Sequence, residues 1–157
     1  MADTVFWWKL WKLLHLIGAF GFVAAHGATA AVALKLRRER APERVRALLD
    51  LSRSTRGFMY LSLVVLLVGG IANGFVLHVW DRGWIWAAIV LLALLIVVAF
   101  PLAVPYYAAI RRAVSPQEPA GEERLGALLA SRRPLVVMWI ETVGIVLIVW
   151  LMVFKPS

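Results

Sequence analysis

The stretch that decides the fold is WIWAAIVLLALLIVVAFPLAVPYYAAI, residues 84–110, which contains no charged residue. An apolar run longer than about 18 residues is typical of a helix that crosses a lipid bilayer. Three further apolar runs lie outward from it, at about residues 6–35, 57–79 and 134–154. We therefore expect an all-α protein that folds as a bundle of four transmembrane helices.

The composition of the whole chain agrees with this expectation. The 157 residues are 62% hydrophobic, whereas a soluble domain is about 45–50% apolar. A chain of this length forms one compact bundle, so we expect a single integral membrane domain over residues 1–157. Because the chain has no cysteine, disulfides and thiolate metal sites are excluded, and any metal or haem must bind His, Met, Tyr or carboxylate side chains.

The distribution of basic residues predicts the orientation in the membrane. Thirteen of the 17 Lys and Arg residues lie in the two connections that join the first span to the second and the third to the fourth. The positive-inside rule then makes these loops cytoplasmic and places both termini outside the plasma (inner) membrane. Since this pattern explains the net charge of +8, we expect the lipid bilayer as the partner and no binding of nucleic acid. No small-residue cleavage site follows the first span, so we expect it to be retained.

The two basic connections resemble each other in sequence. Residues 43–49 read ERVRALL and residues 123–129 read ERLGALL, which are identical at five of seven positions. Each segment has the pattern of a short amphipathic helix at the membrane surface. Two interpretations stay open: the chain contains two duplicated helical hairpins, or both segments share the residues that any surface helix uses.

Ionisable residues inside the spans are the first candidates for a functional site, because a bilayer penalises them. Glu141 lies about two turns into the fourth span, and His26 lies about two turns from the same end of the first. Tyr60, Tyr106 and Tyr107 lie near this level on the second and third spans. The group is typical of a proton relay, or of a carboxylate that orients a ligating imidazole. The alternative is a hydrogen-bonded pair that only fixes helix packing.

A second polar group lies nearer the opposite membrane face. His15 shares a helix face with His26, but about 16 Å separates them along the axis, so one cofactor is not held by both. Asn73 is near His15 in depth, and glycines within residues 69–74 flatten the second span, which suits a packed helix or a planar macrocycle. His78 lies almost at the interface, where a solvated histidine is the simpler interpretation.

The segment Lys12-Leu13-Leu14-His15-Leu16-Ile17-Gly18-Ala19, followed by His26-Gly27, resembles the first helix of a group of small bacterial membrane proteins. These are the four-span proteins of the CopD-like and DUF2269 types. The chain is more weakly similar to haem-binding membrane proteins of the HemJ type. The resemblance implies haem b or copper bound through His15, with His26 as a further candidate ligand.

Three functions remain open at this point. The first is a haem b- or metal-binding protein with a redox or accessory role, in which His15 and His26 are the candidate ligands. The second is a scaffold or accessory subunit of a larger membrane complex, without any cofactor. The third is an oligomeric permease for protons, metal ions or a small solute, in which His26 and Glu141 line the pathway. The sequence leaves open whether the protein is an enzyme, because it contains no recognised catalytic motif.

Overall fold

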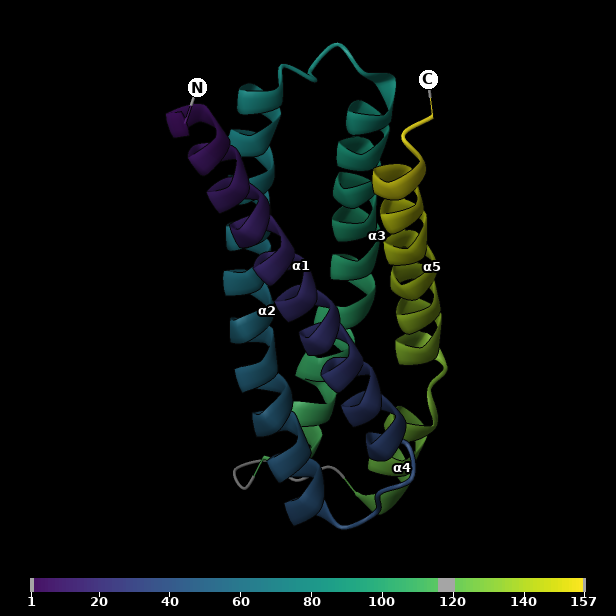
Figure 1. Cartoon of the computed structure of the whole chain (residues 1–157). Helices are drawn as coiled ribbons and strands as arrows, with labels where there is room; N and C mark the ends of the chain where they lie inside the picture. The colour runs from purple at the N-terminus through teal and green to yellow at the C-terminus, as the bar shows by residue number, and fades with distance from the viewer. Residues whose placement is uncertain (1, 116–120, 157) are drawn as a thin grey trace.

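The computed structural model describes residues 2–115 and 121–156, and in these ranges it consists of α-helices without a strand (Figure 1). The helices are α1 (Ala2–Leu36), α2 (Pro42–Leu77), α3 (Gly83–Ala113), α4 (Glu122–Ala130) and α5 (Arg133–Phe154). Four segments of the described chain, which contain α1, α2, α3 and α5, are long and apolar enough to cross a membrane. The prediction of an all-helical protein is therefore confirmed, and the structure has four candidate spans in the described residues.

The two ends of the bundle hold different parts of the chain. Both chain ends and the turn at residues 78–82 lie at one end, and we call this part of the bundle the terminal half (Figure 1). The connection at residues 37–41 and helix α4 lie at the other end, in what we call the loop half.

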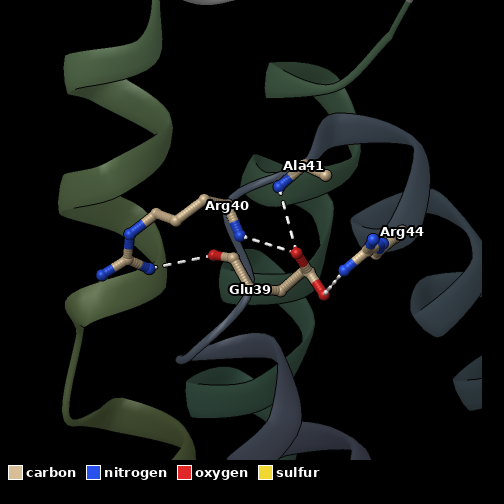
Figure 2. A network of polar contacts seen from close by, with 4 residues as sticks. All are labelled: Glu39, Arg40, Ala41 and Arg44. Carbon is tan, nitrogen blue, oxygen red and sulfur yellow. Dashed lines mark hydrogen bonds and ion pairs between the residues drawn. The ribbon is translucent and has the colours of Figure 1, made fainter.

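The sharp turn between α1 and α2 is fixed by one carboxylate (Figure 2). Glu39 Oε1 accepts hydrogen bonds from the backbone N–H groups of Arg40, at 3.0 Å, and Ala41, at 3.1 Å. Its other oxygen lies 3.9 Å from Arg44 Nη1. The two backbone hydrogen bonds, assisted by the Arg44 charge, hold the pKa of Glu39 below its ordinary value. Pro42 then begins α2, where its fixed φ suits the first turn of a helix.

The long helices pack as two pairs. Helix α1 packs along α2, and α3 packs along α5 (Figure 1). The first pair is close because glycines lie at the crossing: a Cβ atom placed on Gly69 would be 2.6 Å from the backbone nitrogen of His15, and Gly18 lies against the backbone of Leu66. Small residues at such crossings are typical of membrane helices.

The main buried core lies in the loop half, where α1, α2, α3 and α4 meet. Leu36, Val45, Ile110 and Leu129 have no exposed surface. The other buried members of this cluster are Val32, Leu49, Tyr106, Tyr107, Ala113, Val114 and Leu125. Residues from four helices thus close this end of the bundle.

Two arginines hold the same end together through helix C-termini. Arg46 Nε donates a hydrogen bond of 2.7 Å to the carbonyl of Val114, just after α3. Arg37 Nη2 donates to the carbonyl of Ala130, the last residue of α4, at 3.4 Å. The last carbonyls of a helix lack intrahelical partners and carry partial negative charge, so a guanidinium there is favourable.

One of the two basic connections differs from the sequence-based expectation. Residues 43–49 are the first turns of the continuous helix α2 and not a separate surface helix, because the chain stays helical from Pro42 onward. Residues 123–129 do lie in the separate helix α4. The turn at residues 78–82 makes α2 and α3 antiparallel, but each packs mainly on another helix. The duplication of hairpins stays a prediction.

Candidate functional site

A large cavity lies in the terminal half, between the α1–α2 pair and the α3–α5 pair. Its volume is about 960 Å³, and all four long helices and the turn at residues 78–82 line it. This is within the range of about 300–1,000 Å³ that is usual for ligand pockets. Most of its walls are aliphatic, including Leu66 and Leu67 of α2, Leu92 of α3, and Ile145 and Ile148 of α5. We call it the terminal cavity.

His15 lines the terminal cavity, and its orientation is fixed by α2. Its Nδ1 lies 2.9 Å from the backbone carbonyl oxygen of Leu66. A carbonyl only accepts, so Nδ1 must be the donor, and in the neutral imidazole Nε2 then keeps its lone pair. Gly70 makes room for the ring, because a Cβ atom at that position would lie 2.8 Å from Nδ1.

The glycines of α2 thus have specific neighbours. Gly69 meets the backbone of His15, Gly70 meets its ring, and Gly74 meets the indole of Trp80, whose Cζ2 would lie 2.9 Å from an added Cβ. These contacts bring α1 and Trp80 against α2. They account for the glycines by packing, which was one of the two interpretations of the sequence.

Asn73 and Trp80 also line the terminal cavity. Asn73 Oδ1 and Trp80 Nε1 are buried and have no hydrogen-bond partner among the described residues. Trp80 packs against Phe75 and Trp86 at tilted angles, with ring centroids 5.2 and 6.0 Å away. From the sequence, Trp80 is only one of several interfacial tryptophans, and its place in the cavity wall depends on the turn that follows α2.

His26 lies between α1 and α5, away from the terminal cavity. Its Nδ1 is 3.4 Å from Glu141 Oε2, and its Nε2 is 3.2 Å from Thr142 Oγ1. The His26 and Glu141 side chains are 12% and 31% exposed, so the contact is partly buried. Both imidazole nitrogens of His26 therefore already have partners on α5. To bind a metal ion, His26 would have to lose one of these two contacts. Thr142 was not named from the sequence, although it has nearly the same depth as Glu141.

The tyrosines predicted to surround this pair lie in different environments. Tyr106 and Tyr107 are buried in the loop-half core, with ring centroids 5.2 Å apart, and the Arg56 guanidinium lies 5.6 Å from the Tyr107 ring centre. Tyr60 is 53% exposed on α2. In the described part of the chain, no hydrogen bond joins these tyrosines to the pair. A role for them in a relay stays a prediction.

His78 has a backbone role at the end of α2. Its φ of 52° and ψ of 45° are left-handed helical values, and its N–H donates to the carbonyl of Phe75 at 3.3 Å. A residue in this conformation ends a helix, although glycine or asparagine is the usual choice. The side chain is exposed and does not line the terminal cavity.

No group of three or more His, Asp or Glu side chains in residues 2–115 and 121–156 is arranged to hold a metal ion. The polar residues chosen from the sequence thus fall into two separate places. His15 and Asn73 line the terminal cavity, whereas His26 and Glu141 form a contact between α1 and α5.

The family model for predicted integral membrane proteins, DUF2269, matches residues 9–156. The chain belongs to this family. Membership agrees with the four long apolar helices and covers both places described above. No curated protein and no solved structure matches the chain. The similarity to the CopD-like and HemJ types stays a prediction.

Proposed function

We propose that this DUF2269 protein binds a membrane-soluble ligand in the terminal cavity. The observation that carries the proposal is a space of about 960 Å³ with aliphatic walls from all four spans. The space lies between the two helix pairs and is partly open at its side, so a molecule dissolved in the bilayer can reach it. Its size and aliphatic walls favour occupation by a molecule that partitions into the bilayer.

His15 favours haem b as one specific ligand. The hydrogen bond of Nδ1 to the Leu66 carbonyl leaves Nε2 as the ligating nitrogen, which is the usual arrangement around a metal-bound imidazole. His15 is the one described imidazole in the cavity, so it would supply a single axial ligand. Bound haem b would supply one-electron redox chemistry. Copper fits less well, because the described residues offer no cluster of ligands beside His15.

The remaining alternatives stay proposals with less support. A permease pathway through His26 and Glu141 would need the pair to open, whereas both imidazole nitrogens contact α5. An accessory role in a larger complex, or assembly as a homo-oligomer, rests only on the large exposed apolar surface, which the lipid bilayer also explains.

The test is to purify the protein in a mild detergent, record its absorption spectrum and analyse a solvent extract by mass spectrometry. We expect about one lipophilic molecule per chain that persists through size-exclusion chromatography. If the ligand is haem, the spectrum should show a Soret band. The band should be lost in the His15→Ala variant and should remain in the control variant His78→Ala. If a ligand is retained but shows no Soret band, haem b is not the ligand and the proposed function stands. If the protein purified in mild detergent contains no ligand, the proposed function is wrong.

A further inference from the structure

The opening of the terminal cavity carries positive charge from three separate parts of the chain. Lys12 of α1, Arg82 of the turn and Lys155, just after α5, all line the cavity and are exposed. Asp81 is the single acidic residue among the cavity-lining residues, and it lies 3.8 Å from Arg82. Two of the three cations are thus left without a neutralising carboxylate in the cavity lining.

Aromatic rings hold the two lysines in place. Lys12 Nζ lies 5.0 Å from the ring centre of Trp8, and Lys155 Nζ lies 5.9 Å from that of Trp84. Neither lysine has an acidic partner among the described residues. A cation–π contact at an exposed site is weak and uses none of the N–H donors, so each ammonium group keeps its hydrogen-bonding capacity for an anion.

The tryptophans also indicate the depth of this opening in the membrane. Trp8, Trp80, Trp84 and Trp86 lie in the terminal half near the lysines. Tryptophan is enriched at the level of the lipid headgroups, where its ring is apolar and its N–H is polar. The cations therefore lie at the depth at which lipid phosphates occur, whereas the aliphatic walls continue toward the bilayer centre.

From this arrangement we infer that the retained ligand is a phosphate-headed anionic lipid and not haem b, an inference that rests on the proposed function of binding a membrane-soluble molecule. The phosphate lies among Lys12, Arg82 and Lys155, and the acyl or isoprenoid chain lies along Leu92, Ile148 and their aliphatic neighbours. Free phosphate does not fit, because it leaves the apolar walls unfilled. An uncharged lipid does not fit, because it leaves the lysines without an anion.

The test is native mass spectrometry of the delipidated protein with three lipids of equal chain length: phosphatidylglycerol, phosphatidylethanolamine and uncharged diacylglycerol. We expect phosphatidylglycerol to bind most tightly. A basic residue near an anionic headgroup contributes about 1 kcal/mol, or about fivefold in affinity. Lys12→Gln and Lys155→Gln should each weaken phosphatidylglycerol binding by about that factor.

Lys9→Gln is the matched control, because Lys9 is exposed on the same helix but does not line the cavity. It should leave the affinity unchanged. Equal affinity for all three lipids, or equal losses in the Lys9 and Lys12 variants, would overturn the inference and leave the proposed function intact. Lipid affinity that is also unchanged when Ala19→Phe narrows the cavity would overturn both, because the lipid would then bind elsewhere.

Discussion

The two halves of this bundle are built from the same four spans but pack differently. In the loop half, α4 and the first turns of α2 fill the space between the helix pairs, and Leu129 and Val45 are fully buried. In the terminal half, the turn at residues 78–82 joins α2 to α3, and the terminal cavity lies between the pairs. The contrast indicates that the extra helical turns at the loop end, packed against the ends of α1 and α3, close this end of the bundle.

The first prediction compares two isoleucines of α3, one in the loop half and one in the terminal half, and we expect it to show the largest difference in stability. Ile110→Ala should destabilise the protein by about 2–5 kcal/mol, because it leaves a void in a fully buried cluster. Ile89→Ala should cost about 0.5 kcal/mol, because Ile89 is 39% exposed and already lines the cavity. Reversible unfolding in mixed micelles, followed by circular dichroism, measures both changes. Equal losses would show that the two halves are packed alike.

The second prediction concerns the contact between α1 and α2, which runs through both halves. Gly69→Ala should destabilise the protein by about 1–3 kcal/mol, since the new methyl group meets the backbone of His15 and the helices must separate. Gly57→Ala on the same helix has open space around it, and should stabilise the protein by up to about 1 kcal/mol through helix propensity. The same unfolding assay measures both. A neutral Gly69 variant would contradict the close crossing.

Much of the architecture could be predicted from the sequence, because span length and hydropathy are local properties. The shared depth of His26 and Glu141 also followed from counting turns along two helices, and these side chains lie 3.4 Å apart. The terminal cavity could not be predicted, because hydropathy does not show which spans pack laterally. Arg46 is a similar case: it counts as a loop charge in the sequence, yet it binds the carbonyl of Val114 in another helix.

A third prediction tests whether the His26–Glu141 contact stabilises the bundle between its two halves. A double-mutant cycle of His26→Gln and Glu141→Gln should give a coupling free energy of about 0.6 kcal/mol, and at most about 1.7 kcal/mol, as measured for polar pairs in membrane bundles. Pairing His26→Gln with Glu39→Gln, in the turn after α1, is the control and should show no coupling. Zero coupling in the first cycle would mean that the pair does not contribute to packing.

The smallest expected effect lies in the loop half and depends on pH. The pKa of Glu39 is lowered in the folded state, so its contribution is present above the ordinary pKa of about 4.3 and is lost as pH falls through the lower folded value. The melting temperature of Glu39→Gln should therefore fall below that of the wild type at neutral pH, and the difference should vanish in acid. It should persist at about 1 M salt, because backbone hydrogen bonds are the main cause. A pH-independent difference would contradict this assignment.

The decisive question is whether narrowing the terminal cavity weakens the binding of its ligand. Ala19 lines the cavity, whereas Ala24 lies on the exposed surface of the same helix, so Ala19→Phe and Ala24→Phe form a matched pair. Native mass spectrometry of both variants, purified as the wild type is, gives the number of bound molecules per chain. We expect Ala19→Phe to retain clearly less ligand than the wild type, and Ala24→Phe to retain as much as the wild type. Equal retention in all three proteins would show that the ligand does not bind in the terminal cavity.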